Sequence, residues 1–199
     1  MYYMNMRRTQ FRNFMLGLMI FLAVPTLLVL VVCSFGVQQA GTPLSGEFTI
    51  QNNYRYISAE DGRSWRVIFQ SPWNNTFSGT VRHVSRWEDA SAPFMSHDVL
   101  VTSGAFTDPA LVKTSVMDHR IIYRFRGDRP QGEISLLHVF PASAEVLAAL
   151  EKIHNGDQVR ISGREIFVIN FYNARGNGAG HIFDRGCYTI LVTKVEIIP

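Results

Sequence analysis

The feature that most constrains this chain is a long stretch near its N-terminus that carries no formal charge. No Asp, Glu, Lys or Arg occurs from Asn13 to Gly46. Within this stretch, the 22 residues from Phe14 to Phe35 are almost all apolar. In an α-helix they would measure about 33 Å, which is enough to cross a hydrocarbon core of about 30 Å. The sequence therefore predicts one N-terminal transmembrane helix, over residues 14–36.

The charges on either side of this segment predict its orientation. Arg7, Arg8 and Arg12 precede it, and the first charged residue after it is Glu47. Positive residues stay on the cytoplasmic side of a membrane, so we expect residues 1–13 to be a cytoplasmic basic tail. Residues 37–44 then form a tether, and residues 45–199 form an extracytoplasmic domain, which would be periplasmic in a bacterial inner membrane.

Two other fates of the segment are weaker alternatives. A cleaved signal peptide has an apolar region of about 7–15 residues, and this region is longer. Lipidation at Cys33 would require a small residue just before it, whereas Leu30, Val31 and Val32 occupy those positions. An uncleaved anchor is the favoured interpretation.

Beyond the tether the sequence indicates a mainly β domain with one packed helix. Short β-prone runs recur, and an apolar face at helical spacing predicts a helix from Ser143 to Ile153. Gly163, isolated within a β-prone run, predicts a bulge or bend. Strands in this order with one intervening helix favour a small OB-like β-barrel, and the alternative is an antiparallel α+β sheet with one helix. The run 119–126 is expected to pair with 133–139.

The C-terminal half resembles a group of bacterial membrane-anchored extracytoplasmic proteins. The resemblance rests on three segments, Leu136-Leu137-His138-Val139-Phe140-Pro141-Ala142 before the helix, Gly156-Asp157-Gln158-Val159 after it, and Asp184-Arg185-Gly186-Cys187 before the last strand. It implies a membrane-anchored protein with a β-rich fold, and it implies no chemistry or site residues.

No motif in the sequence predicts catalysis, a cofactor or a metal. Nucleophile signatures such as Gly-x-Ser-x-Gly and Ser-x-x-Lys are absent. The six histidines are His83, His97, His119, His138, His154 and His181. Their spacing matches neither the two-histidine helical pattern nor the paired cysteines of zinc sites. The sequence therefore predicts a protein that is not an enzyme, with no cofactor and no metal site.

The charge balance guides the choice of partner. Of 19 Lys and Arg residues, three precede the apolar segment, which leaves 16 basic against 16 acidic residues after it. A domain with no net charge argues against nucleic acid. Arg120, Arg124 and Arg126 nevertheless form a basic stripe along one predicted strand face, and Arg is enriched at protein interfaces.

These observations favour a non-enzymatic, single-pass accessory or assembly subunit of a larger inner-membrane complex. Its expected partners are integral-membrane proteins and the lipid bilayer, its expected partner-binding residues are Arg120, Arg124 and Arg126, and nucleic acid is excluded. The alternative is a periplasmic module that binds cell-wall glycan or another ligand. In that case Trp73 and Asn74 would form the binding surface, because an aromatic ring beside an amide suits a sugar.

Overall fold

The computed structural model describes residues 53–183 and 186–199. The predicted tail, anchor and tether lie outside these residues. The chain divides into two compact units, Met1–Gln39 and Ala40–Pro199, and the described residues all belong to the second. Over the described ranges, no helix combines the length and the apolar character needed to span a membrane.

The described residues form a mainly β domain, as the sequence predicts. Its strands are β1 (Tyr54–Ser58), β2 (Ser64–Phe69), β3 (Asn75–Arg86), β4 (His97–Thr102), β5 (Val112–Met117), β6 (Arg120–Phe125), β7 (Ile134–Pro141), β8 (Gln158–Tyr172), β9 (Gly178–Ile182) and β10 (Tyr188–Ile198). The helical elements among them are the 3-10 turn η1 (Gly104–Thr107) and α2 (Ala144–Leu150). Helix α2 lies within the predicted range, and the hydroxyl of Ser143 accepts a hydrogen bond from the Val146 backbone N–H, as an N-cap residue does.

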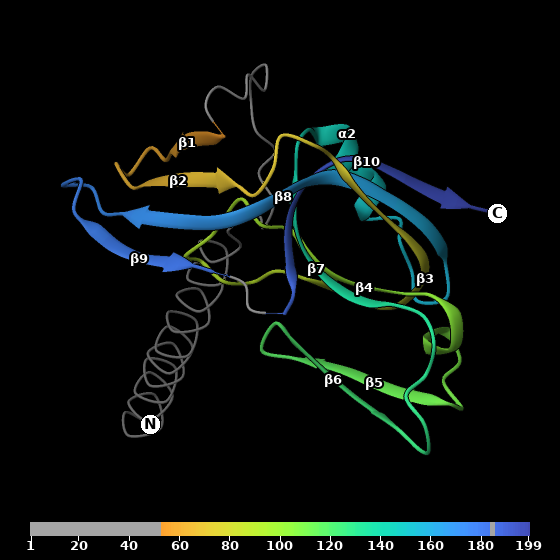
Figure 1. Ribbon diagram of the computed structural model, residues 1–199. Coiled ribbons are helices and arrows are strands. Elements are labelled where there is room, and N and C mark those ends of the chain that lie inside the picture. Colours follow the sequence, from red (N-terminus) through yellow and green to blue (C-terminus); the bar gives the residue numbers. More distant parts are fainter. Residues whose placement is uncertain (1–52, 184–185) are drawn as a thin grey trace, which may run out of the picture. The chain divides into compact units, whose positions relative to one another are not determined.

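Five strands pair in a closed ring. Strand β3 pairs with β4, β4 with β7, β7 with β10, β10 with β8, and β8 returns to β3. The β7–β10 pair is parallel and the other four pairs are antiparallel. Helix α2 connects β7 to β8 and lies beside the ring (Figure 1). A ring of this kind leaves no open edge on these strands, which protects the domain from edge-to-edge association.

The interior of the ring is filled by alternate residues of its strands. Val81, Val99, Leu137 and Ile161 are fully buried there, and Leu150 of α2 belongs to the same cluster. Burial of each such side chain contributes about 1.5–3 kcal/mol relative to exposure. The residues between them point outward, so the outer surface of β4 and β7 is available to carry polar groups.

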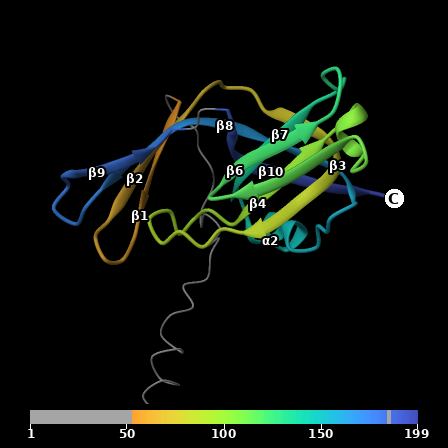
Figure 2. The same cartoon turned by 90° about the horizontal axis from the view of Figure 1, so that it is seen from below.

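Strand β8 belongs to two parts of the domain. Its first half completes the ring, and its second half pairs with β2 and β9 to form a smaller sheet, which Figure 2 shows on the opposite side from β3 and β4. The change occurs at Gly163, where an added Cβ would lie 2.2 Å from the Leu191 carbonyl oxygen. The β8–β10 register shifts at the same place, between Val192 and Lys194, so the predicted irregularity at Gly163 is confirmed.

Strands β5 and β6 form a separate two-stranded sheet, which we call the β5–β6 hairpin. The expectation that the run 119–126 pairs with 133–139 is wrong, because β6 pairs with β5 and β7 pairs with β4 and β10. The reason lies in the connection. Asp118 and His119 both have positive φ, 49° and 59°, as a two-residue type I′ hairpin turn requires. That turn reverses the chain immediately before β6 and gives it a local partner.

Candidate functional site

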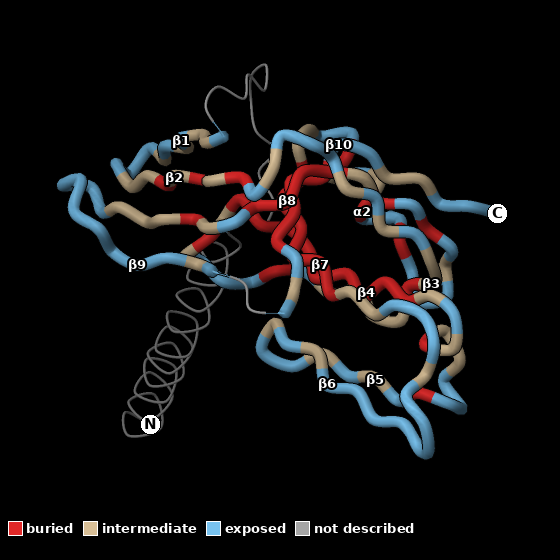
Figure 3. Tube along the Cα trace, viewed as in Figure 1, coloured by how far each residue is buried: buried red, intermediate tan, exposed pale blue. Residues whose placement is uncertain are grey.

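The outward face of the β5–β6 hairpin gathers cationic and aliphatic side chains. We define this hairpin outer face by six exposed residues that alternate along the two strands. They are Lys113, Ser115 and Met117 on β5 and Arg120, Ile122 and Arg124 on β6. None of the six is acidic. Met117 and Ile122 are 61% and 44% exposed, and Figure 3 shows most of the hairpin as exposed or half-buried.

The three cations of this face have no compensating partner among the residues that the structure describes. Neither an ion pair nor a side-chain hydrogen bond joins Lys113, Arg120 or Arg124 to any of those residues. Lys113 and Arg124 also lie directly opposite each other in the strand register. Like charges in directly opposed positions destabilise a strand pair, so the isolated domain retains an unfavourable interaction at this position.

The hairpin is fixed to the barrel near both of its ends. At its base, the guanidinium of Arg82 on β3 donates to the carbonyl oxygens of Phe106 and Val112, over 2.8 and 3.0 Å. At its turn, Nδ1 of His119 lies 2.6 Å from Oδ2 of Asp98 on β4. The inner face packs toward the barrel, and Tyr123 contacts the buried ring of Phe106 edge-on. The outer face is therefore presented on a supported element.

The predicted arginine stripe is placed in part as the sequence suggested. Arg120 and Arg124 lie on β6 and share the outer face with Ile122, and all three are exposed. Arg126 is exposed too, but it lies just beyond the end of β6. Sequence reasoning missed the contribution of Lys113 and Met117, because they join the stripe only through the pairing of β5 with β6.

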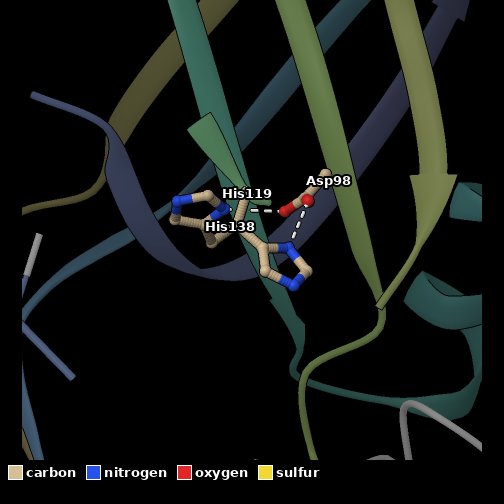
Figure 4. A group of neighbouring side chains, drawn as sticks. All are labelled: Asp98, His119 and His138. Carbon is tan, nitrogen blue, oxygen red and sulfur yellow. Dashed lines mark hydrogen bonds and ion pairs between the residues drawn. The ribbon is translucent and has the colours of Figure 1, made fainter. Parts of the chain in front are cut away.

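A second group of side chains gathers on the outside of the barrel. Asp98 on β4 lies directly opposite His138 on β7, and the turn of the β5–β6 hairpin brings His119 to the same carboxylate. The two Nδ1 atoms lie 2.6 and 2.7 Å from different oxygens of Asp98. Figure 4 shows the two rings on different sides of the carboxylate, each with its second nitrogen directed away. We call these three residues the Asp–His cluster.

The surroundings of the Asp–His cluster are aromatic on one side. The ring of Trp87 lies 3.8 Å from that of His119 and 5.5 Å from that of His138, between centroids. The Nε1 atom of Trp87 is buried and has no hydrogen-bond partner among residues 53–183 and 186–199. Cys187 forms no disulfide with any residue that the structure describes and is half-buried, with Sγ 4.0 Å from the carbonyl oxygen of His119.

His97 lies next to the Asp–His cluster in the sequence but points to the other side of β4. It is opposite Val139, whose side chain belongs to the barrel core. Burial lowers the pKa of His97, and the positive charge of Arg86 lowers this pKa further. The imidazole is therefore held toward its neutral form. Within the described part of the chain, its buried Nδ1 atom has no hydrogen-bond partner.

The residues of the glycan alternative are placed at the surface. Trp73 lies between β2 and β3 with 74% of its surface exposed, and Asn74 beside it is exposed as well. Neither residue lines the cavity of about 530 Å³ that is bounded by residues such as Phe69, Glu165 and Cys187. Trp65 and Trp87 are buried in a hydrophobic cluster outside the barrel interior, together with Phe94 and Phe140, so Trp73 alone of the three tryptophans is available to a ligand.

Sequence reasoning did not find the Asp–His cluster. The three residues are spread from position 98 to position 138, and only the strand register and the hairpin turn bring them together. The adjacent pairs His97-Asp98 and Asp118-His119 were visible, but adjacent residues on a strand point to opposite faces. Recognition of a two-residue hairpin turn at 118–119 would have indicated the cluster, because that turn brings His119 to Asp98. The turn lacks the glycine that usually marks it.

Comparison with known proteins yields little. No family model matches the chain and no curated protein matches it, so the resemblance to bacterial membrane-anchored proteins stays a prediction. Among solved structures, the mitochondrial single-stranded DNA-binding protein Rim1 of S. cerevisiae aligns with 63% of this chain and 94% of its own. The sequences are 9% identical over this alignment and the TM-score is 0.28.

This match contradicts one prediction from the sequence. Nucleic acid was excluded as a partner, and the matched structure belongs to a single-stranded DNA-binding protein, so the exclusion is wrong. The exclusion rested on the charge summed over the whole domain. A sum near zero hides a local cationic surface such as the hairpin outer face, where three cations occur without a carboxylate.

Proposed function

We propose that this chain is a membrane-tethered accessory subunit whose domain binds an acidic protein surface through the hairpin outer face. The observation that carries the proposal is the cationic cluster of Lys113, Arg120 and Arg124 on a supported hairpin, which has no ion-pair partner among the residues that the structure describes. The membrane anchor is the apolar segment 14–36, which rests on the sequence alone. In this proposal the domain binds and positions a partner and performs no chemistry on it.

Electrostatic complementarity supports an acidic partner. Lys113 and Arg124 repel each other across the β5–β6 pair, and a carboxylate placed between them would replace that repulsion with two attractions. Arg also presents a planar fork that fits a carboxylate with two parallel hydrogen bonds. The hairpin outer face therefore offers an acidic partner both positive charge and guanidinium groups whose geometry fits a carboxylate.

The aliphatic residues favour a protein as the source of the acidic groups. Met117 and Ile122 lie among the cations and are largely exposed. Protein interfaces combine an apolar centre, in which Met and Arg are enriched, with a polar rim. Single-stranded nucleic acid is bound by a cationic groove combined with aromatic rings on which bases stack, and the hairpin outer face supplies cations without aromatic rings. Tyr123 and Phe125 belong to the opposite face.

Membrane attachment would support weak docking. A tethered domain meets partners in the same membrane at a high effective concentration, so each contact can be individually weak. The hairpin outer face is small, which suits a contact of this kind. The identity of the assembly is not specified by any of these features.

We also infer that the five-stranded ring is an OB-type barrel. Numbered along the chain, its strands follow the order first, second, third, fifth, fourth, and the helix lies between the third and the fourth. The parallel pair joins the third and fifth strands. This arrangement matches a five-stranded Greek-key barrel.

The test is co-purification of the full-length chain from its native membrane in mild detergent. The variant Arg120→Glu/Arg124→Glu places like charges against an acidic partner, which costs several kcal/mol, and should lose the partner. The control Lys152→Glu/Arg175→Glu reverses the same number of charges at exposed sites elsewhere and should retain it. Circular dichroism checks that both variants are folded.

Three outcomes would overturn the proposal. The first is an unchanged complex in the hairpin variant, and the second is equal loss in both variants. The third is a single-stranded oligonucleotide that binds the wild-type chain and competes with the protein partner, since that outcome would assign the hairpin outer face to nucleic acid.

The exposure of Trp73 supports a second candidate, a glycan-binding module. Because Trp65 and Trp87 are buried, a sugar that stacks on Trp73 should change a fluorescence signal that Trp73→Ala removes. Saturable quenching by cell-wall fragments in the wild type, absent in Trp73→Ala, would favour this candidate. A flat titration would exclude it.

A further inference from the structure

The Asp–His cluster has the composition of a transition-metal site. It offers one carboxylate and two imidazoles, and their ligand atoms lie within 4.8 Å of one another. Imidazole nitrogens select Zn²⁺, Fe²⁺, Ni²⁺ or Cu²⁺ over Mg²⁺ and Ca²⁺, which prefer oxygen ligands. Three protein ligands with remaining positions for water are a common arrangement for zinc and for non-haem iron.

The scaffold holds two of the three ligands rigidly. Asp98 and His138 come from strands in direct register within the closed ring, so their backbones cannot move apart without breaking the barrel. Their side chains are 3% and 4% exposed. Precise placement of two donors by paired strands lowers the ordering cost of binding a metal ion.

The third ligand occupies a backbone conformation that its residue type disfavours. His119 has a φ of 59° and Asp118 has a φ of 49°, in a turn for which Asn-Gly is the preferred pair. A non-glycine residue held in this region carries backbone strain. The side chain of His119, which the preferred glycine would lack, points to Asp98 and lies against Trp87. Its contacts in the cluster, not the turn, therefore explain a histidine at this position.

The charge of the cluster also favours a cation. The ion pairs of Asp98 within the described ranges go to His119 and His138 only. If both imidazoles are neutral, the buried carboxylate has no compensating charge. Buried charges in proteins are paired or coordinate metals, and a divalent ion bound by all three ligands would provide that compensation.

Solvent reaches the cluster from one side. His119 is 37% exposed whereas Asp98 is 3% exposed, so an ion can enter beside the hairpin turn and keep water ligands there. On the other side, Trp87 forms an apolar wall against both imidazoles. Exclusion of water from that side strengthens the electrostatic attraction between ion and ligands.

Binding of an ion is compatible with the protons on the two imidazoles and with the distances between the ligand atoms. An ionised carboxylate only accepts hydrogen bonds, so each Nδ1 carries the proton in the observed arrangement. Binding of the ion at Nδ1 moves that proton to Nε2, which Figure 4 shows directed away from Asp98. Ligands of tetrahedral Zn²⁺ lie about 3.4 Å apart for bonds of about 2.1 Å. The observed 2.6 and 2.7 Å separations must therefore widen by less than about 1 Å, which side-chain rotation supplies.

We propose that Asp98, His119 and His138 bind one divalent transition-metal ion, with Zn²⁺ as the probe that should occupy the site. This site is separate from the hairpin outer face, and neither proposal depends on the other. The ion would also tie the hairpin turn to the barrel, because His119 belongs to the turn and the other two ligands belong to barrel strands.

The experiment is a calorimetric titration of chelator-treated full-length protein with Zn²⁺. We expect one ion per chain, a rise in the melting temperature on binding, and no comparable binding of Mg²⁺. With Co²⁺ in place of Zn²⁺, the bound ion should give visible absorption bands. Loss of a residue that only supports a metal ligand weakens metal binding about tenfold or more. Loss of one of the three ligands themselves should therefore weaken Zn²⁺ binding by at least that factor.

Variants separate a metal site from a structural hydrogen-bond cluster. Asp98→Asn and His138→Gln should weaken Zn²⁺ binding. Asp118→Asn/His119→Gly creates the preferred turn pair, so it should keep the hairpin folded while it removes the third ligand and weakens binding at least about tenfold. His181→Gln, at an exposed position on β9, is the control and should bind as the wild type does.

Two results would overturn the proposal. One is the absence of Zn²⁺ binding by the folded wild-type protein, which would leave the cluster as a structural network. The other is a Zn²⁺ affinity of the Asp118→Asn/His119→Gly variant that equals that of the wild type, because the ion would then be bound elsewhere.

Discussion

Asp98 and His138 lie directly opposite each other on β4 and β7, with 2.7 Å between Oδ1 of the carboxylate and Nδ1 of the imidazole. They form the centre of a polar row that crosses four barrel strands. Ser85 pairs with Asp98 on one side, and Thr189 pairs with His138 on the other. The turn of the β5–β6 hairpin reaches the middle of this row, where Nδ1 of His119 lies 2.6 Å from Oδ2 of Asp98. The two candidate sites of the domain are thus joined through the same short element.

The first prediction concerns the stability of this row without metal. Asp98→Ala should lower the free energy of unfolding by about 3 kcal/mol, because removal of one partner leaves buried polar groups unpaired. Urea unfolding in the presence of a chelator measures the effect. Asp128→Ala, at an exposed loop position, should change stability by no more than about 0.5 kcal/mol. Equal stability of Asp98→Ala and the wild type would show that the hydrogen bonds of Asp98 contribute nothing to the free energy of unfolding.

A second prediction concerns the bend of β8. In Gly163→Ala the new Cβ would meet the backbone carbonyl of Leu191 at 2.2 Å, and a backbone atom cannot rotate away. Overpacking of this kind costs about 1–3 kcal/mol, so the melting temperature should fall clearly. Gly178→Ala meets nothing within 4 Å and is the matched control. A melting temperature for Gly163→Ala at or above that of the control would contradict the close approach of β8 to β10.

Local patterns predicted much of the fold. The helix at 143–153, the bend at Gly163 and the mainly β character all follow from spacing and from single residues. The hairpin escaped prediction because its turn is Asp-His, which lacks the glycine that normally marks a type I′ turn. Once β6 was assigned to the wrong neighbour, Lys113 and Met117 could not be placed beside Arg120 and Arg124.

The Asp–His cluster was beyond the reach of sequence patterns for a related reason. Strand alternation places Asp98 and His138 on the outer side of their strands, but only the register places them opposite each other. His119 reaches them because the hairpin folds back over the barrel. No spacing rule along the chain contains that information, which is why six histidines gave no metal signature.

A third prediction concerns the β1–β2 turn. The pKa of Asp61 is lowered, first by the hydrogen bond from the Arg63 backbone N–H and then by that from the Arg63 side chain. Its stabilising contribution is therefore present above the unfolded pKa of about 3.9 and is lost as the pH falls through the lower folded value. A carboxyl NMR titration should place the Asp61 midpoint below about 3.9.

The variant Arg63→Ala tests the cause of this shift. It removes the side-chain hydrogen bond and the charge but keeps the backbone N–H, so the Asp61 midpoint should rise only part of the way toward the ordinary value. An unchanged midpoint would assign the whole shift to the backbone hydrogen bond.

The central claim, that the hairpin outer face binds an acidic protein, is tested most directly by site-specific photocrosslinking in native cells. A photoreactive residue at Ser115, which lies opposite Ile122 on this face, should form an adduct with one acidic protein. That adduct should disappear when Arg120→Glu/Arg124→Glu is added. The same probe at Asn177, exposed in the β8–β9 loop, should form none. No adduct from Ser115, or the same adduct from both positions, would contradict the claim.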